Sequence, residues 1–218
     1  MLSIRKLKSV IVAAVFAGAA YSQISPTNVT LDTPYQIRYA SNLNIGDSVV
    51  NISNTGARGA ALQSGTSASI TGALCANVYT FSPDEQLVSC CSCPVTPNGL
   101  VSLSVKSDLV SNTLTPATPT SVVIKLLFSA PVGGSCATSS QAPGPLASGG
   151  VAWGTSLHAL PTTPVTYFGA ETPFIPATLS DGEANRLVQG CFFINAMGSG
   201  FGICRSCRLG GLGAVTAN

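Results

Sequence analysis

Residues 87–105 read LVSCCSCPVTPNGLVSLSV, and the fold is predicted outward from this stretch. The turn sequence PVTPNG occupies residues 94–99, and its Asn-Gly dipeptide is a strong signal for a β-hairpin. Residues 100–105 then alternate apolar and polar side chains, as a strand with one buried face does. The stretch therefore predicts antiparallel strands that carry three closely spaced cysteines.

Similar strand patterns recur on both sides of this stretch, with turn residues between them. Further strands are predicted at residues 35–39, 48–53, 67–81 and 121–129, the last of which (SVVIKLLFS) is the most apolar and is expected to be central. Short strands at regular spacing are typical of antiparallel β-sandwiches. We therefore expect a mainly β protein whose antiparallel β-sandwich-like core covers residues 23–130.

Residues 131–218 are expected to be a loop-rich C-terminal extension packed on this core. Residues 131–150 are rich in Gly, Pro, Ser and Ala, and residues 151–168 are expected to hold one or two strands. Ser180 and Glu183 then form a capping box, which marks the start of a helix. Apolar residues follow at helical spacing, so the sequence predicts one C-terminal helix over residues 181–196.

The first 22 residues have the three-part pattern of a secretory signal peptide. A basic region precedes an uninterrupted run of apolar and small residues, and Ala20-Tyr21-Ser22 offers small residues for cleavage before Gln23. The alternative is a membrane anchor, but the run is far shorter than the roughly 20 residues that span a bilayer. We therefore expect a secreted, extracellular or cell-surface protein with no stable membrane span after cleavage.

Charged residues are scarce, at 8% of the chain. Removing the signal segment takes away three of the ten basic residues and leaves seven against eight acidic ones. Such a surface cannot neutralise a phosphate backbone, which argues against nucleic acid as a partner. A weakly charged surface also resists self-association poorly, which fits a protein that assembles or binds something.

The chain contains eight cysteines, and all of them follow the signal segment. An even number in an exported chain predicts disulfides, although eight cysteines allow 105 pairings and the connectivity stays open. The disulfide candidates are Cys75, Cys90, Cys91, Cys93, Cys136, Cys191, Cys204 and Cys207. A metal site or a redox-active CxxC is the alternative, but oxidation outside the cytoplasm competes with metal for thiols. We predict no metal and no cofactor.

The sequence offers little for catalysis. His158 is the one histidine, and no G-x-S-x-G elbow is present, so no catalytic residue is assigned. Candidates for ligand binding are the aromatic residues Tyr35, Tyr39, Trp153 and Tyr167, because amphipathic rings suit contacts with sugars. Packing in the core is the alternative explanation for these rings.

Three segments resemble a group of uncharacterised exported, cysteine-rich bacterial proteins. They are LVSCCSCPVTPNGLVSL (87–103), SNTLTPATPTSVVIKLL (111–127) and GSGFGICRSCRLGGLGA (198–214). The resemblance implies export from a bacterium and implies no activity, substrate or binding residue.

Taken together, these patterns lead to one main functional hypothesis and two alternatives. The main one is a non-catalytic structural protein, such as a fibre or surface-layer subunit, whose extended N-terminal lead-in adds a strand to the sheet edge of another copy. The first alternative is an extracellular module that binds glycans or another ligand. The second is a secreted enzyme or a metal or redox protein.

Overall fold

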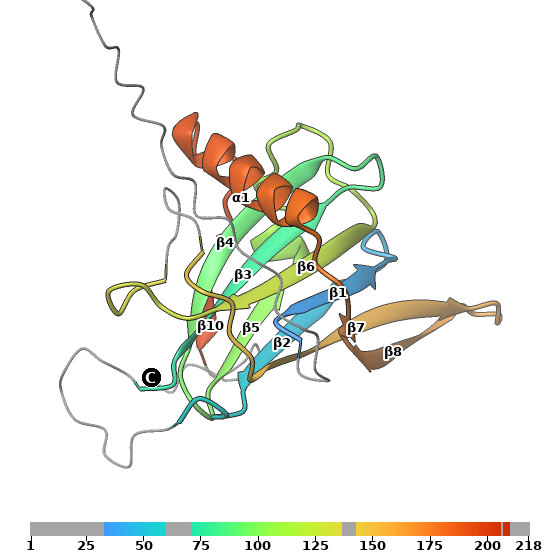
Figure 1. Ribbon diagram of the computed structural model, residues 1–218. Helices are drawn as coiled ribbons and strands as arrows, with labels where there is room; N and C mark the ends of the chain where they lie inside the picture. The colour runs from blue at the N-terminus through green and yellow to red at the C-terminus, as the bar shows by residue number, and fades with distance from the viewer. Residues whose placement is uncertain (1–32, 60–70, 137–142, 206, 210–218) are drawn as a thin grey trace, which may run out of the picture.

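The computed structural model describes residues 33–59, 71–136, 143–205 and 207–209 (Figure 1). The predicted signal segment and the lead-in at residues 23–32 lie outside these ranges. The strands are β1 (Tyr35–Ala40), β2 (Val49–Asn54), β3 (Leu74–Phe81), β4 (Leu87–Val95), β5 (Leu100–Ser104), β6 (Val122–Ser129), β7 (Gly150–Leu160), β8 (Thr166–Pro173), β9 (Ile175–Pro176) and β10 (Arg208–Leu209). A π-helical turn, η1 (Val105–Leu109), follows β5, and one α-helix, α1 (Asp181–Ala196), follows β9.

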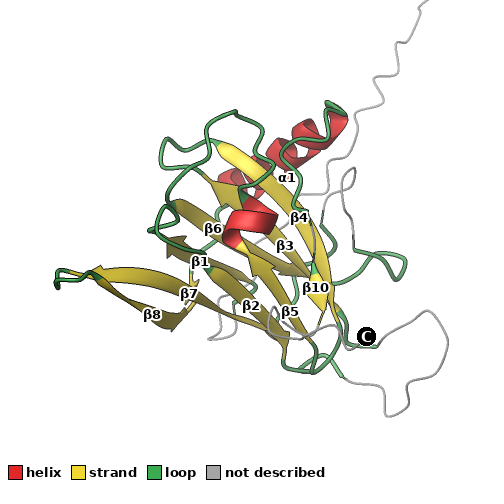
Figure 2. Cartoon of the chain, turned by 180° about the vertical axis from the view of Figure 1, so that it is seen from behind, coloured by secondary structure: helices red, strands yellow, loops and turns green. Residues whose placement is uncertain are grey.

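The strands form two antiparallel five-stranded sheets. The first sheet has the order β4-β3-β6-β1-β9, and the second has the order β10-β5-β2-β7-β8. The apolar strand β6 lies at the centre of the first sheet, as predicted. The mainly β, sandwich-like fold with one C-terminal helix and disulfide links is therefore confirmed (Figure 2).

The main core lies between the two sheets, where alternate residues of facing strands meet. Its fully buried side chains include Val50, Ile52, Val78, Leu103, Ile124, Leu126 and Phe128. Gly150 of β7 lies against the ring of Phe128, because a Cβ there would come within 2.3 Å of the ring. The ring thus fills the space that glycine leaves open, and this contact joins the two sheets.

Helix α1 covers the outer face of the first sheet (Figure 1). Its limits agree with the prediction, and the Ser180 hydroxyl accepts the N-cap hydrogen bond from the backbone of Glu183 at 3.2 Å. The Glu183 carboxylate pairs with Lys125 of β6 at 2.5 Å. Beneath the helix, Leu187 packs in a second apolar cluster and is completely buried. The capping box therefore fixes where the helix begins, and the contacts of Glu183 and Leu187 fix its position on the sheet.

The turn at residues 96–99 differs from the predicted hairpin. It joins β4 to β5, but β4 pairs with β3 in the first sheet and β5 pairs with β2 in the second. Asn98 adopts a positive φ of 60°, which asparagine tolerates, and its backbone N–H donates to Asn54 at the end of β2. The turn therefore crosses between the sheets, because its hydrogen bonds go to β2 and not to the preceding strand.

The half of the chain after residue 130 contributes strands to both sheets. It was expected to pack on the core as an extension, whereas β7 pairs with β2 inside the second sheet and β9 pairs with β1 in the first. Strand β8 continues to residue 173, beyond the predicted limit of 168. No helix among the described residues is long and apolar enough to cross a membrane.

Candidate functional site: the β7–β8 hairpin

The strands β7 and β8 form a hairpin that extends beyond the rest of the sandwich (Figure 1). Strand β7 has eleven residues, and only Gly150 to Gly154 pair with β2. Its register with β8 continues from Trp153 to Leu160. The outer half of β7 therefore has β8 as its one strand partner among the described residues, and the hairpin projects as a two-stranded arm.

A buried arginine holds the base of this arm. Arg38 of β1 donates from Nη2 to Ser156 Oγ at 3.3 Å and to Thr172 Oγ1 at 3.1 Å. Gly154 makes room for it, because a Cβ there would lie 2.6 Å from the guanidinium. Burial lowers the pKa of Arg38, and the charge of Glu171 opposes this shift. The two sheets are thus connected at this end through polar contacts.

The outer edge of β8 carries backbone groups with which no described strand pairs. Phe174 N donates to Ala152 O at 2.8 Å, so in the antiparallel ladder the even-numbered residues of β8 face β7. The N–H and C=O groups of Tyr167, Gly169 and Glu171 therefore point away from the sheet. No described residue pairs with this edge, which makes β8 an open template for another strand.

The other sheet edges are short or covered in the part of the chain that the structure describes. The outer edge of β4 accepts and donates hydrogen bonds, since Cys90 N bonds to Gly202 O and Cys90 O accepts from Cys204 N. Strands β9 and β10 have two residues each. The eight residues of β8 are thus the longest edge without a neighbour among the described strands.

Large apolar side chains are exposed along the same arm. They are Trp153, Leu160, Val165, Tyr167 and Phe168. Phe168 stacks on His158 with ring centroids 5.1 Å apart. A second group lies at the end of α1 and just after it, and consists of Phe192, Phe193, Met197 and Phe201. In the register of the hairpin, Trp153 and Tyr167 lie on one face and Leu160 and Phe168 on the other, so both faces of the arm carry exposed apolar side chains.

The four aromatic residues predicted as ligand contacts occupy different places. Tyr35 is 3% exposed beneath α1, where burial and the charge of Glu183 raise its phenol pKa far above the ordinary value. Tyr39 is exposed on the first sheet. Trp153 and Tyr167 share the outer face of the second sheet, but they lie six positions apart along the arm, about 20 Å at 3.3 Å per residue. The structure does not gather the four into one surface.

Trp153 has polar neighbours on its own sheet face. Its register partner on β2 is Asn51, whose Oδ1 accepts from Ser102 Oγ at 2.6 Å. The Asn51 side-chain amide donates to Glu171 Oε1 at 3.2 Å. A partly exposed indole therefore lies beside a small network of amide, hydroxyl and carboxylate groups.

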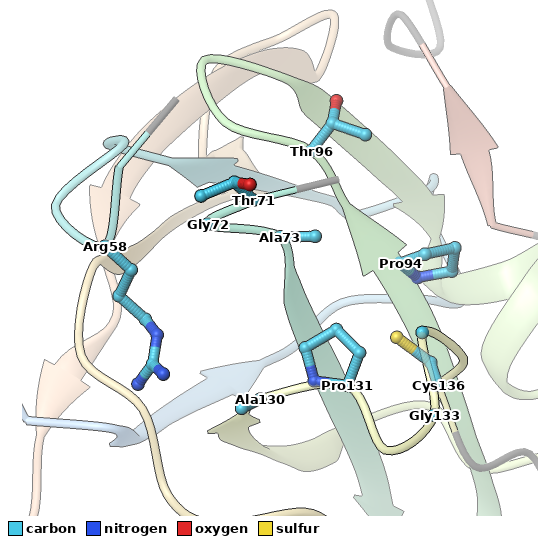
Figure 3. A pocket seen from close by; sticks show the side chains of 11 residues that line it. Arg58, Thr71, Gly72, Ala73, Pro94, Thr96, Ala130, Pro131, Gly133 and Cys136 are labelled. Carbon is cyan, nitrogen blue, oxygen red and sulfur yellow. The ribbon is translucent and has the colours of Figure 1, made fainter. Parts of the chain in front are cut away.

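A cavity of about 850 Å³ opens at the end of the sandwich near the Cys75–Cys136 disulfide (Figure 3). Its described lining consists mainly of small residues, prolines and backbone, and Arg58 is the one charged side chain among them. These groups include no carboxylate or imidazole, so the described lining offers no acid–base pair. The described part of the lining therefore supplies no candidate residue for catalysis.

All eight cysteines predicted to form disulfides are paired. The bonds are Cys75–Cys136, Cys90–Cys191, Cys91–Cys204 and Cys93–Cys207. Cys90 and Cys91 have different partners because adjacent strand residues face opposite sides of the sheet. Three cysteines of β4 thus attach α1 and the segment after it covalently to the first sheet.

Sequence reasoning missed the open edge of β8. The stretch TYFGAETP at residues 166–173 contains β-forming residues, but prolines on both sides led to the expectation of an irregular region. Proline occurs on edge strands, and that was the available signal. Comparisons with known proteins add no further guidance, since no family model, no curated protein and no solved structure matches the chain.

Proposed function

We propose that the chain, after removal of its signal segment, is a secreted or cell-surface structural subunit without catalytic activity. It assembles with copies of itself when an extended segment of one copy adds a strand to β8 of another. The observation that carries this proposal is the eight-residue edge of β8, which projects from the sandwich with outward-facing backbone groups and exposed apolar side chains. Such edges pair readily with another strand.

The donor that we assign to this edge is the lead-in at residues 23–32. Its sequence at residues 27–31, TNVTL, alternates polar and apolar side chains in the manner of a strand. Five residues of a strand span about 17 Å, which matches the stretch of β8 from Tyr167 to Glu171. A donor of this length would satisfy the outward N–H groups of Tyr167, Gly169 and Glu171.

The pairing of every cysteine supports the proposed location. Disulfides persist in oxidising compartments outside the cytoplasm, and these bonds connect segments up to 114 residues apart.

The test compares the chain from residue 23 onward with two proline variants by light scattering after size exclusion and by electron microscopy. Gly169→Pro removes an outward N–H of β8 and leaves the hydrogen bonds with β7 in place, because residue 169 does not face β7. Val29→Pro removes a donor N–H from the lead-in. We expect the parent chain to assemble in a concentration-dependent way and both variants to remain monomeric.

Phe193→Lys is the matched control, because it removes an exposed apolar side chain from α1 and leaves β8 unchanged. We expect it to assemble like the parent. A parent chain that stays monomeric at every concentration would contradict the proposal. Assembly that survives Gly169→Pro and fails with Phe193→Lys would move the interface to α1.

The second candidate function is glycan binding, and the surroundings of Trp153 favour it. An exposed indole can stack on a sugar ring, and Asn51 and Glu171 lie beside it to hydrogen-bond hydroxyl groups. The chain contains one tryptophan, so its fluorescence reports this position directly. Quenching by an oligosaccharide that is lost in Asn51→Ala would support this role, and unchanged emission across a glycan panel would count against it.

A further inference from the structure

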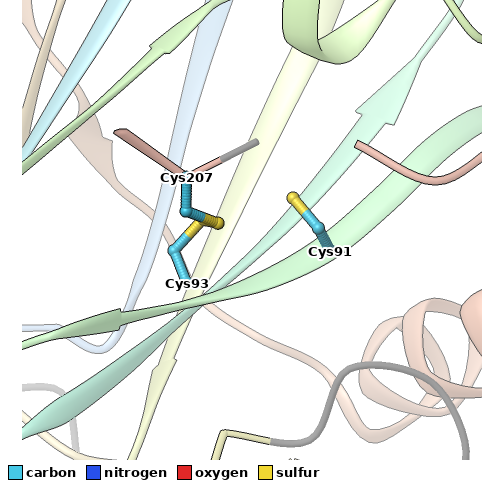
Figure 4. Close-up of side chains that lie close together, drawn as sticks. All are labelled: Cys91, Cys93 and Cys207. Atoms are coloured by element: carbon cyan, nitrogen blue, oxygen red, sulfur yellow. A yellow bond between two sulfur atoms is a disulfide. The ribbon is translucent and has the colours of Figure 1, made fainter. Parts of the chain in front are cut away.

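Four cysteines meet where β4 lies beside the segment that follows α1. Cys91 and Cys93 are two residues apart on one strand, so their side chains leave the same face. The sulfurs of Cys91, Cys93 and Cys207 lie within 4.8 Å of one another (Figure 4). Cys204 is bonded to Cys91 at an S–S distance of 2.09 Å, so a fourth sulfur adjoins this group, although it lies outside the set of sulfurs that are all within 4.8 Å of one another. We call these four residues the CxC/CxxC cluster.

The spacing of the sulfurs is close to that of a tetrahedral thiolate site. Zinc–sulfur bonds of about 2.3 Å place neighbouring sulfurs about 3.8 Å apart. To reach this arrangement, the bonded sulfurs would have to separate from their present S–S distances of 2.09 Å and 2.03 Å, and the Cys204 sulfur would have to turn toward Cys93 and Cys207. It also lies against the main core, with Cys93 buried and the other three partly exposed, so a cation could enter and still be shielded from water.

Backbone contacts hold the two halves of the cluster together independently of their disulfides. Cys90 N of β4 donates to Gly202 O at 2.9 Å, and Cys204 N donates to Cys90 O at 3.3 Å. After Cys207, β10 pairs with β5. The segment is thus anchored on both sides of the CxxC, and opening the two bonds leaves the four sulfurs near one another.

The remaining disulfides are separated from the cluster by the sheet. Cys90 alternates with Cys91 on β4, so its sulfur leaves the opposite face toward Cys191 of α1. Cys75 has Pro94 as its register partner and therefore shares that opposite face. These cysteines cannot join the same metal site, and they supply a natural control.

We propose that the CxC/CxxC cluster is a second, reduced-state binding site for one Zn²⁺ or another thiophilic divalent cation. A dithiol reductant opens Cys91–Cys204 and Cys93–Cys207, and each disulfide gains two electrons and two protons while the dithiol becomes a disulfide. The four thiols then bind the cation as thiolates, and up to four protons are released to the solvent. The site does not involve β8, so a test of cation binding is independent of a test of the proposed assembly.

The experiment adds Co²⁺ to the chain from residue 23 onward after full reduction with a dithiol in the absence of air. We expect one Co²⁺ per chain, with the absorption bands of tetrahedral thiolate coordination, and displacement of Co²⁺ by one Zn²⁺. The variant Cys93→Ser/Cys207→Ser removes two ligands. It should weaken binding about 100-fold or more, since outer-shell changes alone cost about 10–100-fold.

The control is Cys90→Ser/Cys191→Ser, which should retain the affinity and the spectrum of the parent chain. Because every protein is compared in the reduced state, the serines remove ligands without removing a disulfide that the parent still has. Absence of the tetrahedral spectrum in the parent would overturn the proposal, whether the sulfurs stay apart or the reduced chain unfolds. Equal binding by both double variants would overturn it as well.

Discussion

Three of the four disulfides should differ in their contribution to stability in an order opposite to their sequence separations. The bonds Cys75–Cys136, Cys90–Cys191 and Cys93–Cys207 span 61, 101 and 114 residues. Taken one at a time, loop-closure entropy assigns the largest effect to the longest loop. The perturbation we consider replaces each of these pairs by two serines, with Cys91–Cys204 kept intact in all three variants.

The structure changes this ranking because Cys91–Cys204 already joins the same two regions. With that bond in place, Cys90–Cys191 closes a ring of about 15 residues, worth about 3 kcal/mol. Cys93–Cys207 closes a ring of only about 5 residues, worth about 2 kcal/mol. No other disulfide shortens the loop that Cys75–Cys136 closes. This loop therefore keeps its full separation of 61 residues, which is worth about 4 kcal/mol.

The assay is urea unfolding of the oxidised proteins, with the remaining disulfides verified by mass spectrometry of unreduced peptides. The loss of unfolding free energy should be greatest for Cys75→Ser/Cys136→Ser and smallest for Cys93→Ser/Cys207→Ser. Each variant replaces one disulfide by two serine hydroxyls. The differences among the three variants therefore report mainly the size of the ring that each disulfide closes. An order that follows sequence separation would refute the reasoning, and so would equal losses in the three variants.

Three further predictions concern the core, the helix and the buried phenols. Gly150→Ala should lower the unfolding free energy by about 1–3 kcal/mol in urea, because its methyl group meets Phe128, and adding Phe128→Leu should return part of that loss. Ser180→Ala removes the N-cap acceptor of α1 and should cost about 1 kcal/mol, with unchanged strand content by circular dichroism. Burial raises the pKa values of Tyr35 and Tyr79 in the folded state, so their stabilising effect is complete below the ordinary tyrosine pKa of 10.0 and is lost as the pH rises beyond it. Two delayed tyrosinate signals in a base titration, appearing together with unfolding, would confirm this, whereas ionisation of both phenols in the folded protein would contradict it.

Local signals in the sequence were sufficient for the helix and for most strands. The capping box at Ser180 and the apolar spacing after it predicted α1 with its observed limits, because a helix start depends on residues within one turn of each other. The central place of β6 followed from its continuous apolar side chains, since a strand covered on both faces needs them.

Features that depend on distant contacts were not predictable in the same way. The dipeptide Asn98-Gly99 specifies a tight turn but does not specify which sheet the next strand joins, and hydrogen bonds to Asn54 decide that. The disulfide partners depend on the path of the chain after α1. The open edge of β8 is defined by the lack of a neighbour among the described strands, and Pro173 is the one local signal for it that β8 contains.

The cysteines of β4 are synthesised long before their partners. When Cys90, Cys91 and Cys93 leave the ribosome, Cys191, Cys204 and Cys207 are still about a hundred residues behind. The three neighbouring thiols of β4 can then form disulfides with Cys75 or with another chain before their native partners are synthesised. The observed pairing therefore forms either after a delay in the oxidation of these three thiols or by thiol–disulfide exchange that reshuffles early bonds.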